Sequence, residues 1–265
     1  MIDWMNPDWS YMLGVVHGDG SIAPRSIDIS VGYKDAEYAD VLISLWKKMG
    51  FDPKTYRPRS SLKIAVHSAN LQREFAPLKQ NGTWFWPELF DTANYVAGIV
   101  DTDGYVGTPL VAKRIVVTLK RSGNLSKLAD ILRDMGMERI YVKEKTSTYN
   151  GKPYEIEELL IHRMEDIATF SEKVRLRHFR KAERLLVLHK YITDKLSKVS
   201  IWKQVGLWLQ EEPRTWEEIA ENFNLTKDQV DSVLQNLKRN ATVKVIPPPK
   251  SLTKYHVSGL SSSQE

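Results

Sequence analysis

One segment of about a dozen residues occurs twice in this chain, once as YMLGVVHGDGSI from Tyr11 and once as YVAGIVDTDGYV from Tyr95. Each copy is an apolar run with a glycine in its middle, and each ends in an Asp-Gly pair. The similarity continues downstream, where LISLWKKMGF (42–51) resembles LADILRDMGM (128–137). A repeat of this length predicts two similar subdomains that pack about a pseudo-twofold axis.

The apolar periodicity within each copy predicts the order helix, strand, strand, helix, strand, strand, helix. The first copy spans about residues 9–80 and the second about 93–178. Asp8 is a candidate N-cap for the first helix. An insertion near residues 146–155 lengthens the second copy, and its Asn-Gly pair indicates a hairpin turn. These patterns predict an α+β fold with antiparallel sheets.

The two repeated helices carry small residues four positions apart, Gly14 with Gly18 and Gly98 with Thr102. Small residues on one helical face let two backbones approach closely, so we expect these helices to pack against each other. Asp19 and Asp103 then fall on the last helical turns, where the helix dipole disfavours a carboxylate. Two such carboxylates at one axis favour a cation with oxygen ligands, most simply Mg²⁺, over the alternative of two solvated helix caps.

The segments LGVVHGDG and AGIVDTDG resemble the LAGLIDADG motif of homing endonucleases, in the monomeric form with two motifs per chain. The resemblance covers about residues 9–190. It implies two αββαββα subdomains, paired motif helices and two saddle-shaped four-stranded sheets over the DNA major groove. The family's catalytic, metal-binding acid falls on Asp19 and Asp103, and the preceding carbonyls are those of Gly18 and Thr102. At the sixth motif position His17 replaces the usual acid, and we interpret this histidine as structural.

The resemblance implies a metal-dependent endonuclease that cuts both strands of double-stranded DNA at a long asymmetric site, leaving short 3′ overhangs. Such an enzyme acts as a monomer and promotes the mobility of its intron or host element. Mg²⁺ is the expected cofactor, with Mn²⁺ also accepted and Ca²⁺ bound without turnover. The family's basic active-site residue is assigned by position to Lys79 and Arg177. The alternatives are a non-catalytic LAGLIDADG/helix-turn-helix regulator, which loses the motif acids, and an RNA intron maturase.

The chain carries a net charge of +5, and much of its basic character is concentrated in residues 173–198, which hold nine Lys or Arg and two acids. A concentrated basic segment favours a polyanionic partner. Exposed strand positions would read bases or fix phosphates. The candidate DNA-binding residues are Lys63, His67, Arg114, Thr118, Lys120, Tyr141, Lys143, Lys145, Arg175, Arg180, Lys181, Lys227, Lys238, Arg239, Lys244 and Lys250.

The pattern changes after about residue 199. An amphipathic helix IWKQVGLWLQ is followed by a helix capped by Thr215 and Glu218, by a third helix from Lys227, and by two short β segments. This order is typical of a winged helix-turn-helix domain, whose third helix we expect to enter a neighbouring major groove. The predicted domains are 1–92 and 93–198 for the repeated subdomains and 199–258 for the winged helix-turn-helix, with a disordered tail at 259–265.

The chain contains no cysteine, which excludes disulfides and thiolate zinc sites. No apolar run approaches the roughly 18 residues of a membrane span, and MIDWMNPDWS lacks the basic start of a signal peptide. We therefore expect an intracellular protein of the cytoplasm or nucleoid, with an organelle as the alternative.

Overall fold

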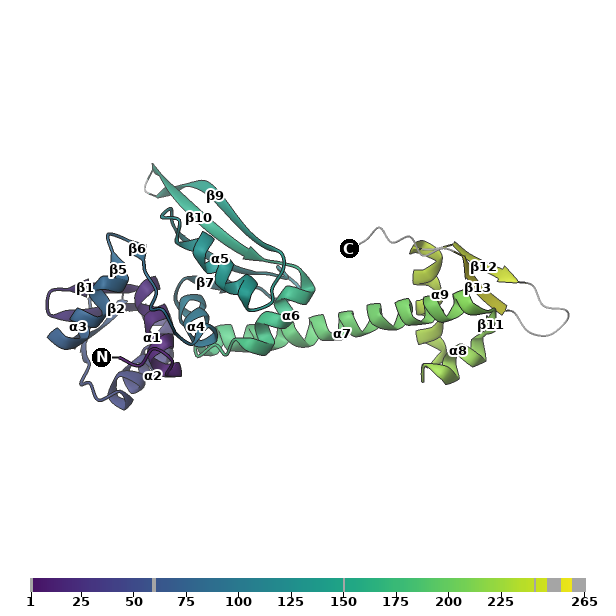
Figure 1. Ribbon diagram of the computed structural model, residues 1–265, viewed down its shortest axis with the longest axis horizontal. Helices are drawn as coiled ribbons and strands as arrows, with labels where there is room; N and C mark the ends of the chain where they lie inside the picture. The colour runs from purple at the N-terminus through teal and green to yellow at the C-terminus, as the bar shows by residue number, and fades with distance from the viewer. Residues whose placement is uncertain (1, 59–60, 150, 241, 247–253, 259–265) are drawn as a thin grey trace. The chain divides into compact units, whose positions relative to one another are not determined.

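The computed structural model describes all residues except 1, 59–60, 150, 241, 247–253 and 259–265. The chain divides into two compact units, residues 1–192 and 193–265. The boundary falls within the longest helix, α7 (Phe179–Glu211). Each unit is described by itself below (Figure 1).

The first unit contains two copies of one pattern, helix, two strands, helix, two strands, helix, as predicted. In the first copy the elements are α1 (Pro7–Gly18), β1 (Gly20–Ala23), β2 (Ser26–Gly32), α2 (Ala36–Lys48), β3 (Lys54–Tyr56), β4 (Ser61–His67) and α3 (Ala69–Phe75). In the second copy they are α4 (Thr92–Asp103), β7 (Gly104–Val106), β8 (Ile115–Lys120), α5 (Asn124–Asp134), β9 (Ile140–Tyr149), β10 (Lys152–Ile161) and α6 (Met164–Lys173), followed by α7.

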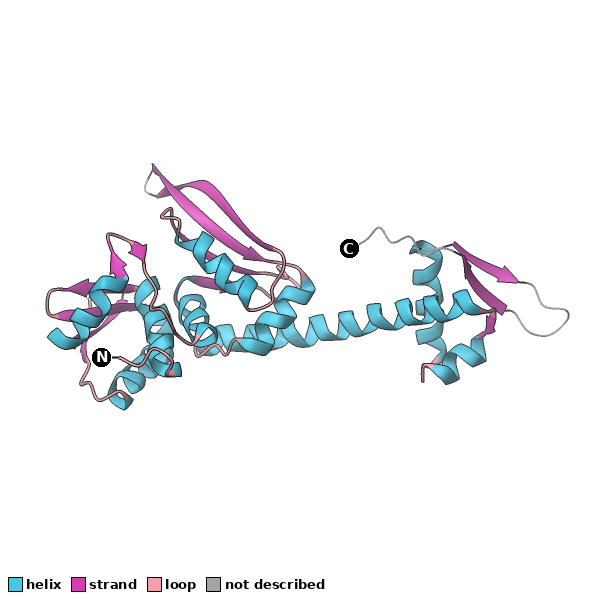
Figure 2. Ribbon diagram, viewed as in Figure 1, coloured by secondary structure: helices cyan, strands magenta, loops and turns pink. Residues whose placement is uncertain are grey.

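The two four-stranded sheets have the same topology, which confirms the predicted α+β fold. Their strand orders are β1-β2-β4-β3 and β7-β8-β10-β9, and all neighbouring strands are antiparallel. Helices α2 and α3 pack against the first sheet, and α5 packs against β9 and β10 (Figure 2). Each sheet therefore buries a face rich in Ile, Leu and Val beneath its own helices.

A short connection joins the two copies and bears on the site described below. It consists of a 3₁₀ turn (Ala76–Leu78) and a small hairpin of β5 (Lys79–Gln80) and β6 (Thr83–Trp84). Gly82 has a φ of +82°, in the left-handed region that the tight turn requires.

The second unit combines the C-terminal part of α7 with α8 (Trp216–Asn222), α9 (Lys227–Asn240) and a three-stranded sheet. The strands are β11 (Arg214–Thr215), β12 (Thr242–Ile246) and β13 (Lys254–Ser258), in the order β11-β13-β12. Its core is built from Val205, Leu209, Ile219, Val230 and Leu237. Helices followed by a paired hairpin match the winged helix-turn-helix order that the sequence predicts.

Two local details differ from the sequence analysis. The N-cap of α1 is Asn6, whose side chain accepts the amides of Asp8 and Trp9, so Asp8 lies inside the first turn. The helix predicted from residue 201 is continuous with the basic helix before it, because residues 179–211 contain no proline and a single glycine, Gly206. The capping box of Thr215 and Glu218 forms as predicted.

In the described part of the chain, no helix is long and apolar enough to span a membrane.

Candidate active site

The two motif helices, α1 and α4, pack with their backbones in direct contact. A Cβ atom on Gly14 would overlap the carbonyl oxygen of Tyr95, and one on Gly98 would overlap the carbonyl oxygen of Tyr11. The exchange is reciprocal, as a pseudo-twofold axis between the helices requires. The predicted helix pair is therefore confirmed, and glycine is required at both crossing positions because any side chain there would meet main-chain atoms.

The acids lie at the C-terminal ends of these helices, one on each. Asp19 is the C-cap of α1, and Asp103 is the last residue of α4. A Cβ atom on Gly18 would overlap the hydroxyl of Thr102 and the Oδ2 atom of Asp103. The Asp103 carboxylate thus lies against the end of the opposite helix, which brings the two acids to one seam.

The two carboxyl groups perturb each other. Burial raises the pKa of Asp103 to about 7, and the nearby Asp19 charge contributes to this rise. Desolvation by the surrounding protein atoms also raises the pKa of Asp19, although part of its side chain is exposed. The charges of Lys181 and Lys79 oppose this shift. The site therefore holds negative charge at a helix-dipole end that disfavours it. A cation binding here would be stabilised by both groups.

Two lysines flank the acids in pseudo-symmetric positions. Nζ of Lys79 in β5 lies within hydrogen-bonding distance of the carbonyl oxygens of Val16 (2.9 Å), His17 (2.8 Å), Gly18 (3.2 Å) and Gly20 (2.7 Å), which share its three N–H donors. Each of these carbonyls belongs to the end of α1 or to the residue pair that follows it, where helical acceptors lack partners.

Lys181 of α7 repeats this arrangement at α4. Its Nζ donates to the carbonyl oxygens of Val100 (2.9 Å), Asp101 (2.8 Å) and Thr102 (3.1 Å). Burial lowers the pKa of both Lys79 and Lys181 to about 8, and the charges of Asp19 and Asp103 oppose that shift. The four groups form one compact cluster of two acids and two bases, each with its pKa moved toward neutrality.

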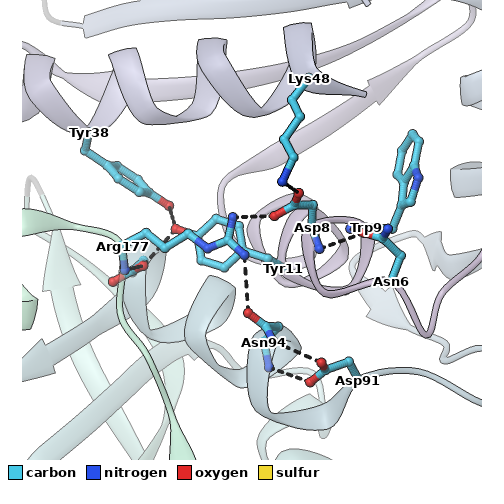
Figure 3. Close-up of polar contacts among 10 residues, drawn as sticks. Asn6, Asp8, Trp9, Tyr11, Tyr38, Lys48, Asp91, Asn94 and Arg177 are labelled. Atoms are coloured by element: carbon cyan, nitrogen blue, oxygen red, sulfur yellow. Dashed lines mark hydrogen bonds and ion pairs between the residues drawn. The ribbon is translucent and has the colours of Figure 1, made fainter. Parts of the chain in front are cut away.

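The structure does not place the Arg177 side chain at this cluster, so the sequence-based assignment of Arg177 needs correction. Its guanidinium donates to Asp8 (2.8 Å) and Asn94 (3.3 Å) and stacks 4.3 Å from the centre of the Tyr11 ring (Figure 3). Asp8 lies eleven residues before Asp19, about 16 Å along the helix axis. Arg177 therefore ties together the N-terminal ends of α1 and α4, and the position equivalent to Lys79 belongs to Lys181.

The donors that the family resemblance assigns to a metal are oxygen atoms: the carboxylates of Asp19 and Asp103 and the carbonyls of Gly18 and Thr102. Hard oxygen donors suit Mg²⁺, Mn²⁺ or Ca²⁺ and do not suit a thiolate metal. Within the described residues, no group of three or more His, Asp or Glu side chains could hold an ion. A metal at this site would thus depend on the carboxylate pair, main-chain oxygens, water and substrate phosphate, a donor set that Mg²⁺ commonly uses.

A polar cavity of about 340 Å³ opens beside the acids on the side of the second motif. Asp19, Asp101 and Thr102 line it together with Lys34, Lys181 and Arg184. Arg180 also lines this cavity, where its guanidinium forms an ion pair with Asp35. Asp19 is therefore open to a ligand in a cavity whose lining carries both acidic and basic side chains.

Five candidate DNA-binding residues of the second sheet share one face. Strand pairing places Thr118 and Lys143 on either side of Glu158, and Lys120 and Lys145 on either side of Ile156. Directly paired residues in an antiparallel sheet project from the same face. Tyr141 pairs with Leu160 on that face too, and Arg114 precedes β8 with its side chain exposed. The sequence analysis missed Glu158, which forms an ion pair with Lys145.

In the first sheet, Lys63 and His67 alternate along β4 as predicted, but each has a neighbour that the sequence analysis did not consider. Lys63 forms a 2.8 Å ion pair with Asp28 of β2, and the His67 ring lies 3.4 Å from the Tyr56 hydroxyl. Ala65, which lies between them on the same face of β4, is buried with 1% of its surface exposed. Lys63 in the first sheet, like Lys145 in the second, is therefore paired with an acid of a neighbouring strand.

The remaining candidates are more scattered. Arg175 is exposed and donates to the Ser171 carbonyl, and Lys227, Lys238 and Arg239 are exposed on α9. Lys244 belongs to β12, but its side chain is outside the described part of the structure, as is all of Lys250. Within the first unit, the structure therefore brings together the acid pair with Lys79 and Lys181, and it places a separate group of candidates on one face of the second sheet.

No protein-family model matches the chain. Uncharacterized protein MJ0398 of Methanocaldococcus jannaschii is 27% identical over 197 residues, which cover 68% of this chain and 70% of that protein.

Similar solved structures include LAGLIDADG proteins of two kinds. Full-length DUF199/WhiA from Thermotoga maritima has a TM-score of 0.44 and 14% identity over 88% of this chain and 90% of its own. A mesophilic variant of the homing endonuclease I-DmoI has a TM-score of 0.49 and 15% identity over 65% of this chain and 93% of its own.

Proposed function

We propose that this protein is a divalent-metal-dependent endonuclease that hydrolyses both strands of double-stranded DNA. The observation that carries the proposal is the pseudo-symmetric cluster in which Asp19 and Asp103 meet at one helix seam between Lys79 and Lys181. Stability alone does not favour such an arrangement, because burial raises the pKa of Asp103 to about 7 and lowers those of both lysines to about 8. One acid and one lysine for each half suit a substrate with two antiparallel strands.

The roles of the residues follow from their charge and position. Asp19 and Asp103 would hold Mg²⁺, with Mn²⁺ as a substitute and Ca²⁺ as a non-productive ligand. When bound, the metal would supply a nucleophile at neutral pH and stabilise charge on the scissile phosphate. Lys79 and Lys181, whose N–H groups lie on helix-end carbonyls, would place positive charge beside the phosphate as negative charge develops there. The exposed strand residues around Thr118, Lys143 and Lys145 would fix the DNA, with base contacts giving sequence preference.

The C-terminal unit would extend the contact to DNA. Lys227, Lys238 and Arg239 are exposed on α9, the third helix of a winged helix-turn-helix order. In that architecture the third helix lies in the major groove and the wing contacts backbone. We therefore infer a long, asymmetric target bound by a monomer, in an intracellular setting where DNA is available and where cutting would promote mobility of the host element.

A second candidate function is DNA binding without cleavage, and one observation favours it. The ammonium groups of Lys79 and Lys181 already bind the carbonyls of Gly18 and Thr102, which a metal would otherwise use. A protein that keeps these lysines in place would need no metal to hold its motif ends together. An RNA maturase would use the same basic face, and no feature of the described residues favours it over DNA binding.

Cleavage of a DNA library decides between these functions. The parent protein is incubated with Mg²⁺ and a library of random or host-insertion-site sequences, and cut ends are sequenced beside Asp19→Asn and Asp103→Asn. An exposed acid outside the cluster supplies the matched control, Asp40→Asn. We expect cutting by the parent and control, and nicking or inactivity for either site variant.

Two further measurements make the outcome interpretable. Metal binding is followed without DNA cleavage by the enhancement of water proton relaxation with Mn²⁺, which Asp19→Asn and Asp103→Asn should weaken. Equal cleavage by parent and both variants would refute the two-acid mechanism. Tight, sequence-specific DNA binding without any cutting would establish the second candidate instead.

A further inference from the structure

The sixth position of each motif holds a different residue, His17 in α1 and Asp101 in α4, and both side chains are buried. Each receives a hydroxyl from the opposite helix. Tyr11, which begins the first motif, donates to Asp101 Oδ2 (2.7 Å), and the hydroxyl of Tyr95, which begins the second, lies 3.0 Å from His17 Nδ1. The two contacts are related by the pseudo-twofold axis, although the residues that receive them are chemically unlike.

The other partner of His17 is the backbone beside Lys79. His17 Nε2 lies 2.7 Å from the Leu78 carbonyl oxygen, and a carbonyl can only accept, so Nε2 carries the proton. Nδ1 is then the acceptor for Tyr95, and the ring is neutral, in agreement with burial lowering the pKa of His17 to about 3. The ring also stacks on Trp84, 5.1 Å away, which is the strand partner of Lys79. His17 therefore contacts both the residue before Lys79 and the residue paired with Lys79 across the hairpin.

The other partner of Asp101 is the backbone that leads to Lys181. Asp101 Oδ2 accepts the amides of Arg177 (2.7 Å) and His178 (3.1 Å), just before α7 begins (Figure 3 shows the Arg177 region). The carbonyl of His178 in turn accepts the amide of Lys181 (3.0 Å). Two bonds therefore link the Asp101 carboxylate to the main chain of the lysine.

Each anchor has the polarity that its backbone target requires. In the first copy the segment before Lys79 presents a carbonyl, which needs a donor. In the second copy the start of α7 presents amides, which need an acceptor and whose positive dipole end favours a carboxylate. An acid at position 17 would face the Leu78 oxygen and be repelled. A histidine in place of the family's usual acid at position 17 thus follows from the backbone groups that it meets, since the segment before Lys79 presents a carbonyl and the segment before Lys181 presents amides.

We propose that His17 and Asp101 are positioning residues, each of which holds the active-site lysine of its own half, Lys79 and Lys181 respectively, at the end of its motif helix. This inference rests on the proposed nuclease function for its catalytic consequence, and it rests on the contacts above for the position of the lysines. Its distinctive consequence is that each anchor serves one half of the site, so the two anchors should affect different DNA strands.

The first test resolves cleavage by strand. His17→Phe keeps an aromatic ring on Trp84 and removes the donor, and Asp101→Leu keeps the size and removes the acceptor. With saturating DNA, a misplaced lysine should slow its strand about 10- to 100-fold. We expect His17→Phe to slow one strand and Asp101→Leu the other, with an unchanged dissociation constant for uncut DNA in Ca²⁺. Equal slowing of both strands by each variant indicates a general structural effect and overturns the inference.

Conservative variants supply the rescue. His17→Gln keeps a side-chain N–H donor, and Asp101→Asn keeps one oxygen acceptor while its amide group replaces Oδ1, which has no hydrogen-bond partner among the described residues. Both should restore strand rates to within about threefold of the parent, because the bond to the backbone is kept. Failure of both rescues would contradict the assigned polarity. If an apolar variant does not fold, His17→Ala and Asp101→Ala, which add no bulk, replace it.

The second test needs no DNA cleavage and so separates this inference from the proposed function. Lysine amines of the folded full-length protein are labelled briefly with acetic anhydride and quantified by mass spectrometry. In His17→Phe, Lys79 loses its hold on the carbonyls, so the ratio of Lys79 labelling to Lys181 labelling should rise at least about threefold over the parent. In Asp101→Leu the same ratio should fall, because Lys181 is the lysine released. Local opening of the structure governs how fast reagent reaches each amine. If the two variants show these opposite labelling changes but the parent protein cuts no DNA, the inference stands and the proposed nuclease function is refuted. An unchanged ratio in both folded variants would overturn the inference.

Discussion

Substitution of Gly14 by alanine tests the central packing on which the site depends. A Cβ atom at this position would lie 3.0 Å from the amide nitrogen of Ile99 and 3.1 Å from the Cα atom of Gly98, and would overlap the Tyr95 carbonyl. Ordinary contact with a carbon atom begins at about 3.5 to 4.0 Å. All three obstacles are main-chain atoms of α4, which cannot rotate away, so α1 and α4 must separate by about 1 Å at their crossing.

The cost follows from that separation. Overpacking in a close-packed core costs about 1–3 kcal/mol when side chains can adjust, and here none can, so we expect about 3 kcal/mol or more. A gap of about 1 Å also forfeits a quarter to a half of the dispersion attraction of the buried pairs along the seam. For a unit of this size, each kcal/mol lowers the melting temperature by about 2–4 °C, which gives a loss of about 6–12 °C.

Differential scanning calorimetry of the full chain measures this loss, and Gly32→Ala is the matched control. Gly32 has a φ of −60°, and a Cβ there would lie 3.7 Å from Asp35 Oδ2 and 3.9 Å from Lys34 Cγ, both ordinary contacts. The control should melt within about 2 °C of the parent, because the backbone already suits alanine. A Gly14→Ala protein that melts with the parent and keeps its DNA cleavage would show that the helices do not touch as described.

Three further predictions concern the charges. Because Asp103 has a folded-state pKa of about 7 against 3.8 ordinarily, the folded state binds more protons between these values and stability falls as pH rises through them. Asp103→Asn should therefore be more stable than the metal-free parent to urea at about pH 8 and equal to it below about pH 4. Lys181→Met should reduce cleavage of bound DNA about 10²- to 10³-fold and also lower the melting temperature, because it removes three bonds to α4 carbonyls, whereas Arg177→Met should lower the melting temperature and leave that cleavage within about threefold. Replacing Lys238 and Arg239 by alanine should weaken DNA binding and reduce the salt dependence of log K by about one unit per charge, as measured by titration at several salt concentrations, without altering thermal stability.

The fold was predictable because short-range sequence patterns determine most of its helices and strands. Apolar periodicity indicated each helix and strand, and the repeat indicated that the two copies would share one topology. The small residues on α1 and α4 indicated a close crossing, which the structure confirms at Gly14 and Gly98. Where the prediction failed, the competing cause was also local: Asn6 caps α1 in place of Asp8, and α7 continues past residue 199 because nothing interrupts it.

The basic half of the site was less predictable, because it depends on how far each side chain reaches in three dimensions. Lys79 follows Phe75 by four residues, but Lys181 follows the equivalent Phe170 by eleven. A longer α6 and the turn before α7 break the repeat register there, so alignment could not identify the second lysine. Arg177 is closer in sequence to the expected position, but its guanidinium is bound by Asp8 and Asn94.

The same contacts that stabilise the fold create the electrostatic state of the site. Gly14 and Gly98 bring α1 and α4 together, and that closeness brings Asp19 and the partly buried Asp103 to one seam. Lysines on both sides offset the acids, yet burial still moves the pKa of Asp103 to about 7 and that of Lys181 to about 8. A cation would stabilise the ionised acids, and a DNA phosphate would stabilise the charged lysines. Each ligand thus removes part of the penalty that opposes the other, so metal and DNA should bind this cluster more tightly together than apart.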